Sequence, residues 1–365
     1  MYKMIPIFKD PQRQAFFEKE GYTTFPLLNA EEVRELRLFY ESKNLFSENG
    51  AGFQISLYNP DKALCREIRD KVLSIVLPKM SVEIENFKAI VASFVAKPAI
   101  PNSVVPPHQD WSFADREEDG YCSLSSWIAL VDTNFDNGGM GVIPGSHKFL
   151  HNHRPSPSPQ CPVPLGQHVF SVFPYMKMID VKAGDILLFD NRTFHASPPN
   201  TSNAPRISVG VGITQKDARL VHYNMKPDGT FKTMLKYYVD EDFYLKYDNA
   251  MLSKMYDEKK PIEGYGQPVE VPYDYADLTV SEMVKLMESS GLTYNSLIAG
   301  KLAKLLGNAG LPSNKEEPVI SYTKPVNQAV VETPSKDAWI DNRSFTQKYT
   351  LKNIVVEIKN RVVGV

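Results

Sequence analysis

Hydrophobic periodicity predicts helices in the first part of the chain. In the segment AEEVRELRLFYESK, Val33, Leu36 and Tyr40 fall on one face of a helix, and Asn29 with Glu32 forms a capping box at its start. The segment KALCREIRDKVLSIVLPKM predicts a second amphipathic helix. Its apolar face is expected to be formed by Leu64, Ile68, Val72 and Ile75. Both helices are expected to pack on a core.

From about Ala89 the pattern changes to short β-rich runs separated by Gly, Pro and Asn turns. These runs are KAIVASFVAK, SLSSWIALVDT, VKAGDILLFDN and RISVGVGIT. The last alternates with period two at Ile207, Val209, Val211 and Ile213. Many short strands with such turns indicate a sandwich or barrel.

The Pro/Ser/His-rich stretch 151–168 predicts a loop, and long loops in compact domains are often lids or binding loops.

The character of the chain shifts again after about residue 245. Thr279 and Glu282 form a capping box before a short helix that contains Met283, Leu286 and Met287 and stops near Gly291. A second helix is expected over about 296–306, followed by a loose polar connection at 314–337 and a partly apolar segment at 346–362. We therefore divide the chain into residues 1–245 and a part-helical C-terminal extension, 246–365, that packs on the core. Three hypotheses for the extension stay open: a cap over an active-site mouth, a homodimer contact, or a docking surface for a carrier-bound substrate.

Composition excludes several classes of partner. The 365 residues carry 41 Lys and Arg against 43 Asp and Glu, a net charge of −2. Without a basic run, the chain has no electrostatic footprint for nucleic acid or for an anionic membrane. No stretch is long and apolar enough to span a bilayer, and the N-terminus has no signal-peptide pattern. The three cysteines show no metal or disulfide spacing, which indicates separate thiols, a reducing compartment and a cytoplasmic protein.

The segment PPHQDWSF carries the strongest local chemistry. His108 and Asp110 are two residues apart, so on a strand they project from the same face and supply two ligands of a 2-His-1-carboxylate metal site. About 0.8 such His-x-acid pairs are expected by chance at this composition, so the pair alone is weak. His195, beyond the apolar run DILLFDN, is the best candidate for the third ligand. Arg206 offers a bidentate partner for a carboxylate, and Ser197 shares the face of His195.

Five ordered segments together resemble the phytanoyl-CoA dioxygenase family of iron/2-oxoglutarate oxygenases, over about residues 10–220. They are FFEKEGYTTFPLL, PPHQDWSF, WIALVDTNFDNGGMGVIPGSHK, GDILLFDNRTFHAS and the strand that begins at Arg206. The resemblance implies a mainly β, jelly-roll (double-stranded β-helix) core with flanking helices. It also implies an enzyme that uses Fe(II), 2-oxoglutarate and O₂. By position, the resemblance assigns iron to His108, Asp110 and His195, and 2-oxoglutarate to Arg206 and Ser197, with Trp127 and Lys97 near the co-substrate.

The implied reaction is hydroxylation of an unactivated C–H bond of a small molecule, with release of succinate and CO₂. The carboxylate of Asp110 argues against halogenation, because halogenating relatives have a small residue there. Desaturation, cyclisation, epimerisation and a non-catalytic ligand-binding jelly roll stay open as alternatives. The sequence does not reveal the substrate, which can be an amino acid, an acyl compound or a secondary metabolite. Substrate binding is expected to involve the loop 149–176 or the segment 219–244. The Tyr-, Lys- and Arg-rich composition of 219–244 is explained equally well by an amphipathic surface helix.

The remaining histidines are expected to lie outside the metal site. His147 is interpreted as part of a structural turn, and His151 and His153 as non-ligands in a Pro-rich loop without a carboxylate. His168 and His222 stay unassigned.

Overall fold

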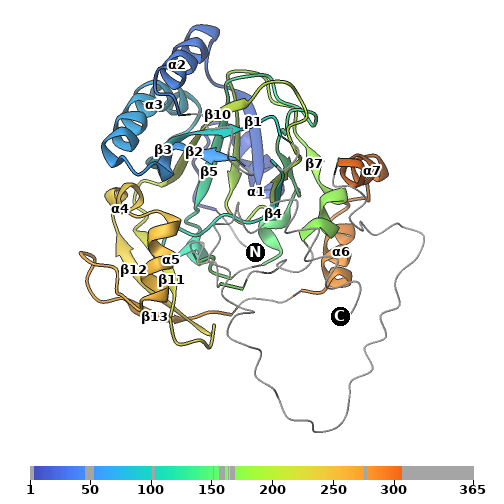
Figure 1. Ribbon diagram of the computed structural model, residues 1–365. Helices are drawn as coiled ribbons and strands as arrows, with labels where there is room; N and C mark the ends of the chain where they lie inside the picture. Colours follow the sequence, from blue (N-terminus) through green and yellow to red (C-terminus); the bar gives the residue numbers. More distant parts are fainter. Residues whose placement is uncertain are drawn as a thin grey trace.

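The computed structural model describes residues 4–45, 53–100, 103–150, 152–155, 161–162, 164, 169–274 and 278–305 (Figure 1). The predicted segments at 314–337 and 346–362 and the end of the helix predicted at 296–306 lie outside these residues, as do His151 and His168. Within the part of the chain that is described, no helix has the length and apolarity needed to cross a membrane.

Two antiparallel sheets form the centre of the molecule. The six-stranded sheet has the order β1-β8-β5-β10-β3-β2, and the four-stranded sheet has the order β4-β9-β6-β7. From β3 to β10 the chain passes back and forth between these two sheets, which is the winding of a double-stranded β-helix. The predicted jelly-roll core is therefore confirmed. The strands are β1 (Tyr22–Pro26), β2 (Gln54–Ile55), β3 (Phe87–Lys97), β4 (Val105–His108), β5 (Leu124–Ala129), β6 (Gly141–Val142), β7 (Lys177–Met178), β8 (Asp185–Asp190), β9 (His195–Ser197) and β10 (Arg206–Gln215).

Strand β10 has one face for the helices and another for the interior of the roll. Its apolar positions 207, 209, 211 and 213 are buried in one cluster with residues of the helices α1 (Pro11–Glu20), α2 (Ala30–Ser42) and α3 (Lys62–Glu83). The alternate positions are Arg206, Ser208, Gly210 and Gly212, and in the ladder the last three pair with Ala129, Trp127 and Ser125 of β5. The period-two pattern thus separates a packing face from an interior face that carries small and polar residues.

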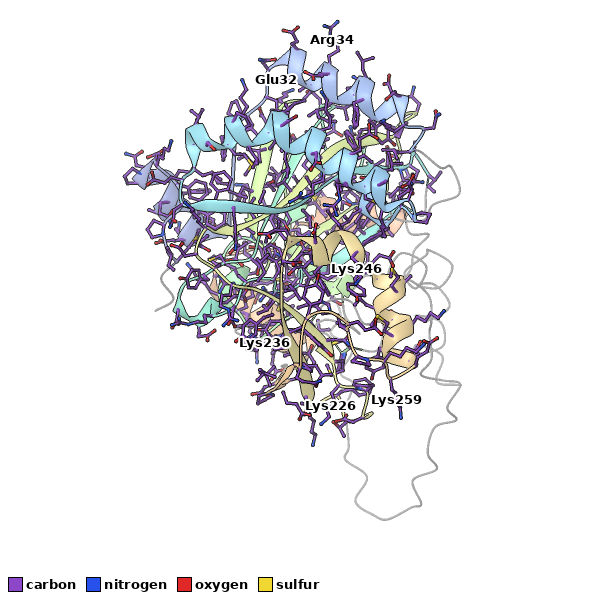
Figure 2. The ribbon with its side chains drawn as sticks, turned by 90° about the vertical axis from the view of Figure 1, so that its left-hand side faces the viewer. Glu32, Arg34, Lys226, Lys236, Lys246 and Lys259 are labelled. Carbon is purple, nitrogen blue, oxygen red and sulfur yellow. The ribbon has the colours of Figure 1, made fainter. Side chains whose placement is uncertain are left out.

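Helices α2 and α3 form the outer layer over the larger sheet (Figure 2). The capping box at Asn29 and Glu32 is confirmed, and Glu32 and Arg34 lie on the outward side of α2. In α3 the buried face is shifted from the prediction. Ile68 and Val72 are buried as expected, but Leu64 and Ile75 are only partly buried. Their immediate neighbours complete the buried face, which contains Cys65, Ile68, Val72, Val76 and Met80.

A second unit follows the jelly roll. Strands β11 (Leu220–Met225), β12 (Thr233–Val239) and β13 (Val269–Pro272) form a separate sheet, with α4 (Glu241–Lys246) and α5 (Asn249–Asp257) beside it. The amphipathic helix considered for 219–244 is wrong. The Tyr- and Lys-rich segment is a β-hairpin that continues into α4. Every residue of β11 is buried, and in β12 Met234 and Tyr237 are buried while the others are partly buried. Lys226 and Lys236 lie on this unit (Figure 2).

The last two described helices, α6 (Val280–Ser289) and α7 (Ser296–Leu305), pack on the smaller sheet. Met283 and Met287 of α6 and Leu302 of α7 are buried with Ile143, Phe194 and other residues of the jelly roll. The capping box of Thr279 and Glu282 is confirmed. Among the described connections lie short 3-10 helices: the single turns Ser56–Tyr58, Glu117–Asp119 and Ser146–Lys148, and the longer segment Val169–Tyr175.

Candidate metal centre

Two facing strands of the smaller sheet bring the histidines together. In the β4–β9 ladder, His108 stands directly opposite His195, and the two ring centroids are 4.2 Å apart. Asp110 follows two residues after His108, and its backbone N–H donates to the carbonyl of Asn191 at 2.9 Å. The spacing of the imidazoles is therefore set by backbone pairing, and the turn after β4 turns the carboxylate toward them.

Hydrogen bonds orient all three side chains toward a common point. The Nδ1 atoms of His108 and His195 lie 2.8 Å and 3.0 Å from the carbonyls of Pro106 and Thr193. Each Nε2 atom lies 3.7 Å from Oδ1 of Asp110. Bonding of one ring nitrogen to a backbone carbonyl fixes the tautomer and presents the other nitrogen to a metal. Ligand atoms of all three residues lie within 4.8 Å of one another, so the donor set fits a divalent ion of the 2-His-1-carboxylate type.

The protonation state of His108 suits a metal ligand. Burial, and after it the neighbouring His195, lowers the pKa of His108 to about 4, while Asp110 opposes this shift. Since a metal binds only neutral imidazole, no proton has to be displaced from this ring near neutral pH.

Ser125 of β5 supports the carboxylate from the second sheet. Its Oγ lies 2.9 Å from Oδ2 of Asp110 and 2.8 Å from Oδ1 of Asn191, and the Asn191 amide donates to the carbonyl of Trp111 at 2.9 Å. These contacts occupy Oδ2 of Asp110 and leave Oδ1 on the side of the histidines. Sequence reasoning did not identify Ser125. The available signal was its position two residues before Trp127, on the same face of a strand.

We expect Ser125→Ala to weaken Fe(II) binding by about tenfold, because the loss of an outer hydrogen-bond partner of a metal ligand typically costs 10–100-fold in affinity. The measurement is an anaerobic metal titration. Ser208→Ala is the control, since its hydroxyl bonds the carbonyl of Val95 instead. Equal affinities in Ser125→Ala and in the wild type would show that the carboxylate is held without this hydroxyl.

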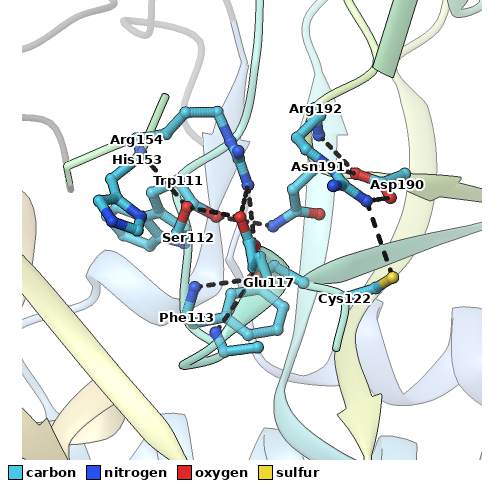
Figure 3. A network of polar contacts seen from close by, with 12 residues as sticks. Trp111, Ser112, Phe113, Glu117, Cys122, His153, Arg154, Asp190, Asn191 and Arg192 are labelled. Carbon is cyan, nitrogen blue, oxygen red and sulfur yellow. Dashed lines mark hydrogen bonds and ion pairs between the residues drawn. The ribbon is translucent and has the colours of Figure 1, made fainter. Parts of the chain in front are cut away.

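A buried network of charges lies behind the metal centre (Figure 3). The carboxylate of Glu117 accepts from Nη2 of Arg154 at 3.0 Å and from the hydroxyl of Ser123 at 2.7 Å. Arg154 also donates through Nε to the backbone carbonyl of Asp110 at 2.7 Å. Arg192 pairs with Asp190 nearby, where Nε lies 2.8 Å from Oδ1. The network fixes the backbone of Asp110, one of the candidate metal ligands. It also holds residues 152–155, the described start of the Pro-rich loop, against that backbone.

We expect Glu117→Gln to lower the free energy of unfolding by about 3 kcal/mol at neutral pH, because it leaves the buried guanidinium of Arg154 without its anion. Burial alone would raise the pKa of Glu117, but Arg154 and Arg192 outweigh it and the pKa is lowered. A lowered pKa stabilises the fold above the carboxyl's ordinary range, and this stabilisation is lost as the pH falls through the folded-state pKa. The wild type should therefore lose more stability on acidification than the variant does.

Urea unfolding between neutral and acidic pH measures both effects. Glu270→Gln is the matched control, because its ion pair with Lys226 is exposed to solvent and such pairs contribute little to stability. A variant as stable as the wild type at neutral pH would contradict the expectation.

Arg206 and Trp127 lie together in the interior between the sheets. The guanidinium lies 4.8 Å from the Trp127 ring and donates through Nη1 to the carbonyl of Gly138 at 2.6 Å. Burial lowers the pKa of Arg206 to about 9, so it stays cationic near neutral pH. Its Nε and Trp127 Nε1 are buried without hydrogen-bond partners, and within the described ranges no carboxylate forms an ion pair with it. A buried cation without an anion is costly, and a carboxylate ligand bound here could offset that cost.

The two remaining candidates for co-substrate binding lie near Arg206. Lys97 is its ladder partner on β3, is fully buried, and donates to the carbonyls of Ser103 and Pro198. Burial, and after it Arg206, lowers the pKa of Lys97 far below its ordinary value. These bonds give Lys97 a structural role at the strand ends. Ser197 is buried on β9, two residues beyond His195.

Comparison with known families agrees with this arrangement. The family model described as phytanoyl-CoA dioxygenase (PhyH) matches residues 29–208, the part that contains both the three converging side chains and Arg206. Over residues 29–208, just under half of the chain, the sequence is therefore similar to the PhyH family.

Curated proteins similar to parts of this chain come from a bacterium and from a plant. A probable alpha-ketoglutarate-dependent hypophosphite dioxygenase of Stutzerimonas stutzeri is 32% identical over 122 residues, 30% of this chain and 40% of that protein. The phytanoyl-CoA dioxygenase of Arabidopsis thaliana is 31% identical over 133 residues, 33% of this chain and 42% of that protein. The chain thus spans about two-fifths of the length of these relatives.

A solved structure resembles the chain more distantly. The non-heme alpha ketoglutarate dependent carbocyclase SnoK from nogalamycin biosynthesis is 19% identical, with a TM-score of 0.43, over 58% of this chain and 86% of that chain. The jelly-roll topology follows from the strand order described above and does not depend on this likeness.

The other histidines whose positions the structure describes, His147, His153 and His222, lie outside the three-residue cluster. His147 contacts the carbonyl of Glu18 through Nε2 at 3.1 Å and packs under Gly21, which supports its interpretation as part of a structural turn. His153 stacks on Tyr223, with ring centroids 4.8 Å apart. His222 is buried beside Phe243. None of the three cysteines is in a disulfide bond in the structure, in agreement with the prediction of separate thiols.

Proposed function

We propose that this protein is an Fe(II)- and 2-oxoglutarate-dependent oxygenase that hydroxylates an unactivated C–H bond of a small molecule. The single observation that carries the proposal is the pairing of two features on the interior face of β5. Ser125 contacts Asp110 of the metal centre, and Trp127, two residues away, contacts the unpaired cation Arg206. Two residues of a strand span roughly 7 Å, the scale of a five-carbon dicarboxylate.

In this proposal, His108, Asp110 and His195 hold the metal on one face, which leaves positions for the co-substrate and for O₂. The bound iron supplies the oxidation, with decarboxylation of 2-oxoglutarate to succinate and CO₂. Arg206 neutralises and orients the far carboxylate of 2-oxoglutarate, and Trp127 and Ser197 flank it. The apolar side chains around Trp127, including Leu187 and Phe189, exclude water from this part of the interior. The names of the relatives, one of them alpha-ketoglutarate-dependent, support the proposal.

An anaerobic titration of the full chain with Fe(II) and 2-oxoglutarate tests the proposal. We expect a weak visible charge-transfer band that requires both components, and succinate release when O₂ is admitted. Arg219→Ala, which removes an exposed guanidinium over Tyr238, is the matched control and should keep the band. A wild-type protein that binds neither component would leave a non-catalytic jelly roll as the better interpretation.

A further inference from the structure

The candidate metal ligand Asp110 does not lie on a strand. The ladder between β4 and β9 pairs His108 with His195, and β4 ends at His108. The residues that follow, 109–113, belong to no helix or strand. The pairing that places the two histidines therefore does not place the carboxylate, and other groups must fix the backbone on which it stands.

Two residues from distant parts of the chain hold the backbone around Asp110. The carbonyl of Asn191 accepts from the N–H of Asp110 at 2.9 Å, and its Nδ2 donates to the carbonyl of Trp111 at 2.9 Å. Arg154 donates from Nε to the carbonyl of Asp110 at 2.7 Å, and its own carbonyl accepts from the N–H of Ser112 at 2.9 Å. Figure 3 shows the side chains of Arg154 and Asn191 beside Trp111 and Ser112. Each of the two residues thus contributes one backbone bond and one side-chain bond.

These bonds decide which oxygen of Asp110 faces the histidines. The N–H and the carbonyl of Asp110 are both engaged, and Oδ2 lies 2.9 Å from the hydroxyl of Ser125. The other oxygen, Oδ1, lies 3.7 Å from Nε2 of each histidine. Oδ2 can also reach an ion at that point only if the backbone lets the carboxylate turn away from Ser125.

Both holding residues are buried, and their cost indicates a role beyond stability. Asn191 is 0% and Arg154 is 6% exposed, and the charge of Arg154 is neutralised by Glu117, with Nη2 3.0 Å from Oε1. Replacement of a buried ion pair by apolar side chains of similar volume is often neutral or stabilising. The stability of the fold alone therefore does not account for a buried Arg154, whereas a fully bonded polar network does restrict the backbone to one geometry.

We propose that Asn191 and Arg154 are positioning residues of the metal centre, which hold the backbone around Asp110 so that it presents Oδ1 to the ion while Oδ2 stays on Ser125. A carboxylate that used both oxygens would take a position that 2-oxoglutarate or O₂ needs. This inference rests on the proposed function and adds the residues that keep those positions open. It also gives the described start of the Pro-rich loop, through Arg154, a role at the metal centre.

Titration of the full chain with Co(II), without co-substrate, tests the proposal apart from turnover. Co(II) substitutes for Fe(II), and its visible spectrum reports the arrangement of ligand atoms around the ion. We expect Asn191→Ala and Arg154→Gln each to bind Co(II) about tenfold more weakly than the wild type, the loss typical of an outer partner of a metal ligand, and to change the spectrum. Arg154→Lys keeps the charge opposite Glu117 and one donor, so it should recover part of the affinity.

A matched control separates positioning from lost stability. Val76→Ala removes apolar volume from the fully buried face of α3, in the cluster under the outer helices. The variant should unfold more easily than the wild type. Because Val76 is not part of the segment around Asp110, the Co(II) affinity and spectrum of this variant should equal those of the wild type.

The outcomes separate this proposal from the proposed function. An unchanged Co(II) affinity and spectrum in Asn191→Ala and Arg154→Gln, or an equal loss in Val76→Ala, overturns the positioning proposal even where the Fe(II)/2-oxoglutarate band forms. Weaker and altered Co(II) binding in the two variants alone, in a protein that never forms the band, sinks only the oxygenase function. A wild type that binds neither Co(II) nor Fe(II) overturns both. Thermal unfolding shows that each variant is folded, and if one is not, the other variant decides.

Discussion

Asp110→Ala is expected to weaken Fe(II) binding by more than about a hundredfold. Asp110 is the only acid in the three-residue cluster, and its Oδ1 lies 3.7 Å from Nε2 of both histidines. Its removal takes away a ligand and the negative charge that offsets a divalent cation, so the loss should exceed the 10–100-fold typical of an outer partner. An anaerobic Fe(II) titration measures it.

Two further variants sharpen this result. Asp110→Asn keeps the shape and removes the charge, so its affinity should fall between those of the wild type and Asp110→Ala. Asp217→Ala removes an exposed carboxylate and should leave Fe(II) affinity unchanged. If Asp110→Ala binds iron as tightly as the wild type, the ion is held elsewhere and the proposed centre is wrong.

Arg206→Met is expected to have opposite effects on co-substrate binding and on stability. The affinity for 2-oxoglutarate should fall at least about thirtyfold, because removing one partner of a buried charge pair costs about 2 kcal/mol or more. The free energy of unfolding of the ligand-free protein should stay equal or rise, since the variant removes a buried cation that has no carboxylate partner in the described structure.

The two measurements are titration of the charge-transfer band with 2-oxoglutarate and urea unfolding without ligand. Arg206→Lys keeps the charge and loses the planar fork, so it should recover only part of the affinity. A large loss of stability together with unchanged 2-oxoglutarate affinity would make Arg206 a structural residue.

The sequence correctly predicts secondary-structure elements whose signals come from residues close together in the chain. The capping box at Asn29 and Glu32 and the period-two run in β10 depend on residues a few positions apart, and the structure confirms both. In α3 the helix is correct but its face is displaced by one residue at both ends. Leu64 and Cys65, like Ile75 and Val76, are adjacent apolar residues, so periodicity alone does not select between them.

Contacts between distant segments could not be predicted in this way. The hairpin at 220–239 has Tyr and Lys side chains that suit an exposed helix or a sheet, and only its pairing with β13 decides between them. The sequence around Ser125 predicts only a strand. Its contact with Asp110 arises because the turn after β4 packs against β5 in the folded chain.

The two faces of strand β10 have different neighbours and therefore different requirements for their side chains. Its odd positions, Ile207 to Ile213, pack in the cluster that includes the outer helices, while its even positions, Arg206 to Gly212, lie on the other face, where Arg206 is proposed to bind 2-oxoglutarate. Because Gly210 and Gly212 place no side chain opposite Trp127 and Ser125, the interior gains room without any change to the packing face. A lineage carrying this strand can therefore alter its ligand by substitution at even positions and its stability by substitution at odd ones, with little conflict between the two.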